Sequence, residues 1–175
     1  MIPELQRVLE PTYLAGVADA PIEQIRAMRS ECSDLENGAS YVRRLAQGRL
    51  DLLAEETKRR AEGGGGSLTE LVDGLADMLS EGVRAPGSGR IDQELDPPES
   101  VVAPLTEVLD AKVGPSVVTA VADLGDDALS AAVIALRDFE EELSGARRSL
   151  HGTIDSLNNE LARRIAGGES PASPS

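Results

Sequence analysis

Two stretches of the chain, residues 21–62 and 126–166, are predicted to be long uninterrupted helices. After Pro21 the first stretch contains no proline and few β-branched residues but many Leu, Ala, Arg, Glu and Gln, a composition typical of helices. Four glycines at residues 63–66 end it, and a Gly-Gly pair ends the second stretch. Roughly 40 residues that rise about 1.5 Å each give ~60 Å, a length that a compact small domain does not need. The fold must therefore find partners for two very long helices.

Apolar residues in both stretches are spaced alternately three and four apart, which is the heptad pattern of a coiled coil. In the first stretch they are Ile25, Met28, Cys32, Leu35, Ala39, Val42, Ala46 and, after an interruption at Arg49, Leu53. In the second stretch the same spacing gives Leu129, Ala132, Leu136, Phe139, Leu143, Ala146, Leu150, Thr153 and Leu157. We call each of these rows of apolar residues a seam. Two seams in one chain most simply bury each other in a helical hairpin. The alternative is that each seam pairs with another copy of the protein.

The remaining segments are shorter. Residues 1–20 are expected to be partly ordered and residues 167–175 to be disordered. The linker, residues 63–125, is predicted to carry short helices, one opened by a capping box at residues 67–70 and another over residues 101–113. No strand pattern competes with this reading. We therefore expect an all-α protein in which two long helices are joined by a linker with short helices.

The composition excludes several classes of function. No Trp, two Tyr, one Phe, one Cys and one His among 175 residues leave few side chains for catalysis or metal binding, so we expect neither an enzyme nor a metal site. The net charge of -14 argues against direct DNA binding through phosphates and favours a basic protein partner. Because the sequence has neither a run of 18 apolar residues nor a signal-peptide pattern, we expect a cytoplasmic protein without a membrane span.

A five-residue polar pattern occurs twice, once in each long stretch, at a constant offset of 104 residues. Its members are Glu36, Ser40, Arg43, Gln47 and Asp51 in the first copy and Glu140, Ser144, Arg147, His151 and Asp155 in the second. At about 100° per residue, each set of five falls within an arc of roughly 80° on its helix. With heptad letters assigned from the apolar residues alone, both copies take the positions e, b, e, b and f.

The shared heptad letters restrict how the two helices can pair. In a parallel pair e faces g, and the two polar stripes would lie on opposite sides. In an antiparallel pair a two-fold axis brings e toward e, and both stripes would border one groove. Such a groove suits a ligand assembly with its own approximate two-fold symmetry. The alternative is that both stripes are solvated flanks that bind nothing.

The residue types in the pattern complement guanine. Arginine donates in bidentate fashion to O6 and N7 of guanine, and carboxylates accept from its N1–H and exocyclic amine. Serine and glutamine can contact ribose or phosphate. Because the chain has no Trp and very few other aromatic residues, bases would have to stack on arginine or on each other.

Two further pairs of residues repeat at the same offset. Arg44 and Arg148 each follow the arginine of the pattern, and they either contact phosphate groups or remain solvated. Gly48 and Gly152 also correspond. Glycine in a helix interior costs about 1 kcal/mol relative to alanine, so its presence at both places indicates close approach by a ligand or partner.

The pattern resembles the signature of the actinobacterial RsiG family, anti-sigma factors that respond to cyclic di-GMP and restrain the sporulation sigma factor WhiG. That signature is Glu, three residues, Ser, two residues, Arg, three residues, Gln, three residues, Asp. Glu36, Ser40, Arg43, Gln47 and Asp51 satisfy every place. The second copy departs from the signature at His151, which occupies the glutamine place. The likeness covers both long stretches but not the linker or the tail.

The resemblance implies a specific function. The family's fold would be an antiparallel helical hairpin, and the two copies of the pattern would together hold a dimer of cyclic di-GMP, two molecules per chain. The loaded hairpin, a monomer, would bind a sigma factor of the WhiG type in a 1:1 complex and keep it from core RNA polymerase. The competing hypothesis is a coiled-coil adaptor that binds its partner without any nucleotide.

Overall fold

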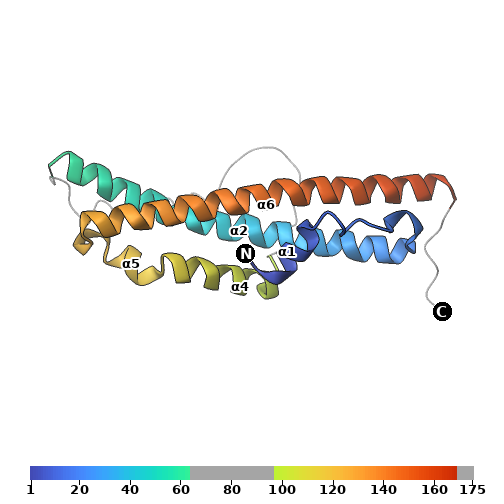
Figure 1. Cartoon of the computed structure of the whole chain (residues 1–175), viewed down its shortest axis with the longest axis horizontal. Coiled ribbons are helices and arrows are strands. Elements are labelled where there is room, and N and C mark those ends of the chain that lie inside the picture. The colour runs from blue at the N-terminus through green and yellow to red at the C-terminus, as the bar shows by residue number, and fades with distance from the viewer. Residues whose placement is uncertain (64–96, 169–175) are drawn as a thin grey trace, which may run out of the picture. The chain divides into compact units, whose positions relative to one another are not determined.

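The computed structural model describes residues 1–63 and 97–168, and every regular element within these ranges is a helix. The α-helices, labelled in Figure 1, are α1 (Pro3–Leu9), α2 (Ile22–Ala61), α4 (Glu99–Lys112), α5 (Pro115–Thr119) and α6 (Asp126–Ala166). Short 3-10 helices, η1 (Val17–Asp19) and η2 (Val121–Asp123), precede the two long helices. The predicted helix that begins at the capping box of residues 67–70 and the predicted disorder of the tail from residue 169 lie outside the described residues.

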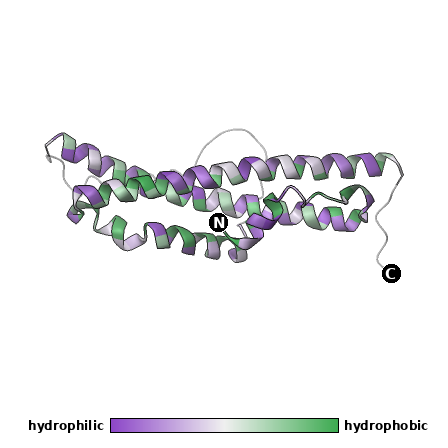
Figure 2. Ribbon diagram, in the orientation of Figure 1, coloured by the Kyte–Doolittle hydropathy of each residue, from purple (hydrophilic) through white to green (hydrophobic). Residues whose placement is uncertain are grey.

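Both heptad seams lie in the interior. Every seam residue of α2 is buried except Met28, and every seam residue of α6 is buried except Thr153; these two are half-buried. Figure 2 shows apolar and polar residues alternating along both helices, as this one-sided burial requires. The all-α hairpin predicted from the spacing is thereby confirmed. Within the described ranges, no helix has the length and hydrophobicity that a membrane span requires.

The chain forms two compact units, and each unit contains part of both long helices. Unit 1 comprises Met1–Arg43, Pro97–Val108 and the described part of Glu141–Ser175. Unit 2 comprises the described part of Arg44–Asp96 together with Leu109–Glu140.

The direction of the long helices is the same in each unit. In unit 1 Arg29 Nε donates to Asn158 Oδ1 at 2.6 Å, and in unit 2 Arg60 Nη1 donates to Asp126 Oδ1 at 2.7 Å. Early residues of α2 therefore meet late residues of α6, and late residues of α2 meet early residues of α6. The helices are antiparallel in both units.

In unit 1, α1 and the first turns of α4 complete the core. Leu5 of α1 and Leu105 of α4 are almost fully buried. Helix α4 packs against α2 at Gly38, where a Cβ atom would collide with the side chain of Val101. Glycine at position 38 is therefore required by packing.

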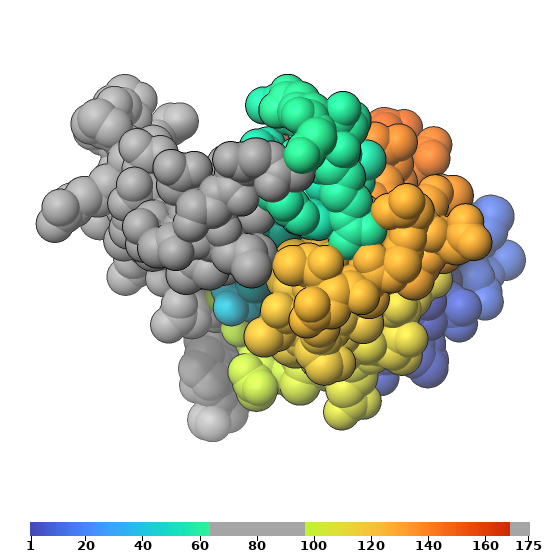
Figure 3. Space-filling view, turned by 90° about the vertical axis from the view of Figure 1, so that its left-hand side faces the viewer, coloured from blue at the N-terminus to red at the C-terminus, as the bar shows by residue number. Residues whose placement is uncertain are grey.

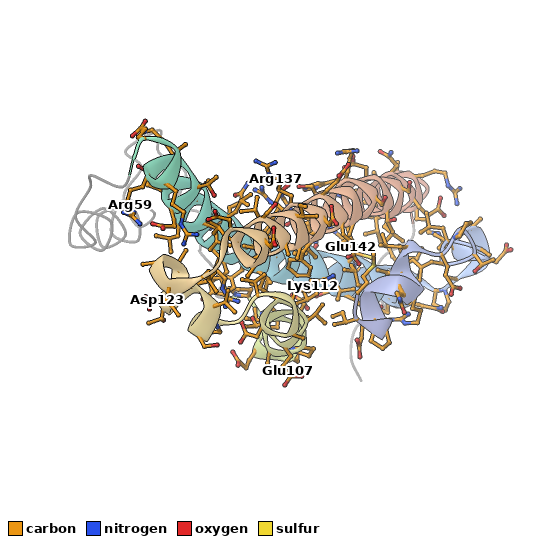
Figure 4. The ribbon with its side chains drawn as sticks, turned by 60° about the vertical axis from the view of Figure 1, so that its left-hand side comes forward. Arg59, Glu107, Lys112, Asp123, Arg137 and Glu142 are labelled. Atoms are coloured by element: carbon orange, nitrogen blue, oxygen red, sulfur yellow. The ribbon has the colours of Figure 1, made fainter. Side chains whose placement is uncertain are left out.

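In unit 2, α4 is held by the residue that interrupts the first seam. Arg49 Nη1 donates to the carbonyl of Val113 at 2.5 Å, and its Nη2 lies 2.6 Å from Asp110 Oδ1. Lys112, labelled in Figure 4, lies over the ring of Phe139 at 6.0 Å from its centroid. Arg49, which interrupts the heptad, thus binds the C-terminal end of α4.

Both long helices carry the sequence Glu-x-x-Arg-Arg near their last turn, at residues 56–60 and 160–164, and these segments correspond at the same offset of 104 residues. In unit 2, Arg60 Nη2 donates to the carbonyls of Val121 at 3.1 Å and Ala122 at 3.3 Å in η2. Figure 3 looks onto this end, where the last turns of α2 in green lie against the segment that leads into α6 in orange.

The other end has the equivalent contacts. In unit 1, Arg164 donates to the carbonyls of Val17 at 2.9 Å, Ala18 at 2.8 Å and Ala20 at 2.5 Å. We call the contacts of Arg60 and Arg164 with these carbonyls the end clasps. Both 3-10 helices have the sequence Val-Ala-Asp, and they too correspond at the offset of 104. The internal repeat therefore extends from the 3-10 helix to the last turn of each long helix.

Each clasp arginine is positioned by a glutamate one turn earlier. Glu56 accepts hydrogen bonds from Arg59, labelled in Figure 4, and from Arg60, and Glu160 accepts them from Arg163 and Arg164. Hydrogen bonds from Arg59 and Arg60 outweigh the opposing effect of burial and lower the pKa of Glu56 to about 2. Those from Arg163 and Arg164 lower the pKa of Glu160 to about 2. Both carboxylates are ionised at neutral pH.

Candidate functional site

Glu36 is the centre of a polar cluster in unit 1 that joins the two copies of the repeated pattern. Its Oε1 accepts hydrogen bonds from Ser40 Oγ at 2.8 Å and from Arg147 Nε at 2.9 Å. The Nε2 atom of His151 lies 3.4 Å from the same oxygen. The Glu36 side chain is only 14% exposed, whereas that of His151 is 57% exposed. Residues from α2 and α6 are thus brought together as the antiparallel heptad argument predicts, with e position Glu36 against e position Arg147.

The environment of Glu36 keeps it charged. Burial raises the pKa of this carboxyl group, but the hydrogen bonds from Ser40 and Arg147 and the nearby positive charge of Arg147 outweigh burial. The net effect is a pKa below the ordinary value. Glu36 is therefore an ionised acceptor at neutral pH.

Unit 2 contains the equivalent contact from the other copy of the pattern. Gln47 Nε2 lies 3.4 Å from Glu140 Oε1 and donates to it. Glu140 stands at the same place in its copy as Glu36, and Gln47 stands at the place of His151. The first and fourth residues of opposite copies therefore meet in both units, with histidine in one unit and glutamine in the other.

The two aspartates that end the patterns differ from the glutamates. Asp51 in unit 2 and Asp155 in unit 1 are exposed. Neither aspartate forms a hydrogen bond or ion pair with any residue in the part of the chain that the structure describes. Their carboxylates are therefore accessible to donors of a ligand.

The remaining members of the pattern lie on the same helices. Arg43 on α2 and Ser144 on α6 are half-buried in unit 1. Arg147 uses Nε toward Glu36, while its two Nη nitrogens make no hydrogen bond with a described residue. Seven of the ten predicted residues thus belong to unit 1, and Gln47, Asp51 and Glu140 belong to unit 2.

This arrangement can bind a ligand with neighbouring donor and acceptor groups. The Arg147 fork offers paired N–H donors, and the exposed aspartates offer paired acceptors. Residues 1–63 and 97–168 contain no group of three or more His, Cys, Asp or Glu side chains suited to hold a metal ion.

The sequence reasoning missed the end clasps. Their signal was present in the sequence, because the Val-Ala-Asp and Glu-x-x-Arg-Arg segments repeat at the same offset as the polar pattern. A search for longer matches at that offset would have found them.

Comparison with known families agrees with the repeated pattern. The family model described as RsiG-like matches residues 11–79 and 116–174, which together make up more than half of the chain. The two matched segments contain both copies of the five-residue pattern and both Val-Ala-Asp segments. No curated protein matches the sequence.

Proposed function

Because the chain belongs to the RsiG-like family, we propose that it is an anti-sigma factor that captures a sigma factor of the WhiG type when it has bound cyclic di-GMP. Membership of the family by itself indicates an anti-sigma factor role, and such proteins are in general not enzymes. The ligand and the identity of the sigma factor are the proposed part.

The observation that carries the ligand proposal is the equivalence of the two polar clusters. Glu36 meets the fourth residue of the other copy in unit 1, and Glu140 meets the fourth residue of the other copy in unit 2. A solvated flank has no need to keep five residue types, their spacing and their contacts in two copies. A ligand made of two equivalent halves gives a reason for both copies, and a dimer of cyclic di-GMP is such a ligand.

The residues fit the chemistry of guanine. Arg43 and Arg147 would donate to O6 and N7, and Asp51 and Asp155 would accept from N1–H and the exocyclic amine. Ser40, Ser144, Gln47 and His151 would contact ribose or phosphate, while Glu36 and Glu140 would orient the arginines and the residues at the fourth place. When bound, the ligand would supply part of the surface that the sigma factor recognises.

The charge of the chain suits the proposed partner. With 31 acidic residues against 17 Lys and Arg, the protein attracts basic surfaces over the screening distance of about 10 Å. Sigma factors carry basic helices for DNA and polymerase, so charge would speed their association with this chain while the loaded site supplies specificity. Captured sigma factor would be unable to bind core polymerase. The complex would form in the cytoplasm, where the polymerase is.

The first test is a calorimetric titration of the full chain with cyclic di-GMP, with cyclic di-AMP as the control ligand. We expect saturable binding of two cyclic di-GMP molecules per chain and no binding of cyclic di-AMP. Arg43→Ala and Arg147→Ala should each weaken binding at least ten-fold without changing helicity, since each removes a charged hydrogen-bond donor. Lys58→Ala is the matched control, because Lys58 is exposed on α2 and, among the residues that the structure describes, pairs only with Glu55 one turn away, at 3.8 Å.

One structural observation favours the adaptor hypothesis. Glu36 is already satisfied by Ser40 and Arg147 within the chain, as it would be in a flank that binds nothing. A pull-down of a WhiG-type sigma factor with and without cyclic di-GMP separates the two hypotheses. Capture that is equal in both conditions, together with no heat of nucleotide binding, would refute the ligand-dependent function.

A further inference from the structure

Arg44 and Arg148 are exposed arginines at equivalent places of the internal repeat. Among the described residues, neither makes a hydrogen bond or an ion pair. Most arginines in the described part of the chain behave differently; Arg26, for example, pairs with Glu23, and Arg49 pairs with Asp110. Arg29 and Arg137 also lack a carboxylate partner among the described residues, but only Arg44 and Arg148 stand at equivalent places of the internal repeat.

The sequence around both arginines lacks the usual helix partners. Charged pairs on a helix form between residues three or four apart. The four such neighbours are Ser40, Tyr41, Gln47 and Gly48 for Arg44, and Ser144, Gly145, His151 and Gly152 for Arg148. No carboxylate occurs in either set, so both arginines keep their positive charge available.

The space beside these arginines is open. At Gly48 and at Gly152 an added Cβ atom would meet nothing within 4 Å. Gly38 on the same helix as Gly48 is different, because Val101 of α4 occupies the space where its side chain would be. Packing therefore explains Gly38 but leaves Gly48 and Gly152 without a reason inside the chain, although glycine weakens a helix relative to alanine. A ligand that approaches the backbone beside each arginine supplies that reason.

Both arginines lie on the face that carries the last residue of the polar pattern. Arg44 precedes Asp51 by one heptad, and Arg148 precedes Asp155 by one heptad, so each pair shares the f position of its helix. A ligand that reaches the aspartate along this face also passes the arginine of the same unit, since Arg44 and Asp51 belong to unit 2 and Arg148 and Asp155 to unit 1.

The charge of the polar pattern requires additional cations. Its ten residues contain four carboxylates and two guanidinium groups, so with neutral histidine they carry a net negative charge. Cyclic di-GMP is itself an anion, with one negative charge on each phosphodiester group. The pattern alone would repel such a ligand electrostatically, although its hydrogen bonds fit the bases. Arg44 and Arg148 are the adjacent positive charges that bring the net charge of the site to zero and so remove this repulsion.

We propose that Arg44 and Arg148 are a further pair of ligand-binding residues, one in each unit, which bind the phosphodiester groups of the cyclic dinucleotide. This inference rests on the proposed function, because it assigns a role at the same site. It adds a sixth place to the repeated pattern, directly after the arginine that reads guanine. The guanine-reading arginine provides specificity, and the arginine that follows it provides the counter-charge.

The decisive experiment compares two double variants that lose the same number of positive charges. Arg44→Ala/Arg148→Ala removes the proposed phosphate contacts, and Arg26→Ala/Lys58→Ala removes two exposed cations that pair with glutamates outside the pattern. By calorimetry with cyclic di-GMP, we expect about a hundred-fold weaker binding for the first variant, roughly ten-fold for each charged contact. The control should bind within about two-fold of wild type. The first variant should also show a weaker dependence of affinity on salt concentration.

Lysine substitutions separate phosphate binding from base reading. Lysine binds phosphate as a point charge but lacks the bidentate fork that guanine requires. Arg44→Lys/Arg148→Lys should therefore recover most of the affinity lost in the alanine variant, whereas Arg43→Lys/Arg147→Lys should not. An Arg44→Lys/Arg148→Lys variant as weak as the alanine variant would overturn the assignment to phosphate.

The outcomes distinguish this inference from the function on which it rests. If wild type binds no cyclic di-GMP, the proposed function fails. If wild type binds and Arg43→Ala weakens binding, but Arg44→Ala/Arg148→Ala binds like the Arg26→Ala/Lys58→Ala control, the function stands and the phosphate role is wrong. Circular dichroism of each variant keeps loss of folding apart from loss of binding; Arg26, Arg44, Lys58 and Arg148 are exposed, so their truncation should leave the helices intact.

Discussion

Removal of the Arg164 side chain should destabilise the protein far more than removal of its neighbour Arg163. Arg164 is 8% exposed and donates to three main-chain carbonyls, those of Val17, Ala18 and Ala20. Arg163 is 65% exposed, and its pair with Glu160 lies on its own helix. Both arginines share that glutamate, so the two alanine variants differ mainly in whether the end clasp of unit 1 is lost.

The magnitude follows from the clasp contacts. Each hydrogen bond to a charged donor contributes about 1.5–3 kcal/mol, and some of the freed carbonyls will gain water after truncation. We therefore expect Arg164→Ala to lower the free energy of unfolding by about 3–5 kcal/mol, the range found when one partner of a buried charged network is removed. Arg163→Ala removes an exposed ion pair and should cost less than about 1 kcal/mol.

Urea and thermal unfolding followed by far-ultraviolet circular dichroism provide the assay. For a chain of this size the expected loss corresponds to a fall in Tm of about 10 °C for Arg164→Ala, and to a few degrees at most for Arg163→Ala. Arg60→Ala should resemble Arg164→Ala, because Arg60 makes the equivalent contacts in unit 2. Equal midpoints for Arg164→Ala and Arg163→Ala would refute the view that the clasp stabilises the helix ends.

Two further predictions concern pH and packing. Because the pKa of Glu56 and of Glu160 is about 2, below the value of about 4.3 in an unfolded chain, the native state binds fewer protons than the unfolded state in this interval. The stabilisation from both glutamates should be complete above about pH 5 and should be lost as the pH falls toward 2. Urea unfolding at a series of pH values across this range tests the prediction. Glu56→Gln should weaken the fall in the free energy of unfolding at acid pH, and an unchanged fall would contradict the assignment. Gly38→Ala should destabilise the protein by about 1–3 kcal/mol through its clash with Val101, whereas Gly48→Ala should stabilise it by up to about 1 kcal/mol. Shifts of the urea midpoint in the same direction for both variants would show that packing does not distinguish the two glycines.

The sequence predicted the hairpin because a heptad seam needs only local spacing to be recognised. Seam residues such as Leu35 and Leu143 recur at intervals that place them on one side of a helix wherever that helix goes, and both are buried. The antiparallel direction followed from the shared heptad letters of the two polar patterns, and the contact between Glu36 and Arg147 bears it out. The ligand for that pattern remains a prediction from residue chemistry and family resemblance.

Tertiary structure decided which individual residues have partners. Arg49 looked like a defect in the first seam, and only the return of the chain 64 residues later shows that it holds the end of α4 through Val113. Gly38 and Gly48 are the same residue type in the same helix, yet only the position of α4 separates a glycine required by packing from one that leaves open space. Arg164 meets Val17 across 147 residues of sequence, because antiparallel helices of matched length bring the end of one to the start of the other. Local spacing determines which face of a helix is buried, whereas the partner of each side chain depends on where distant segments return.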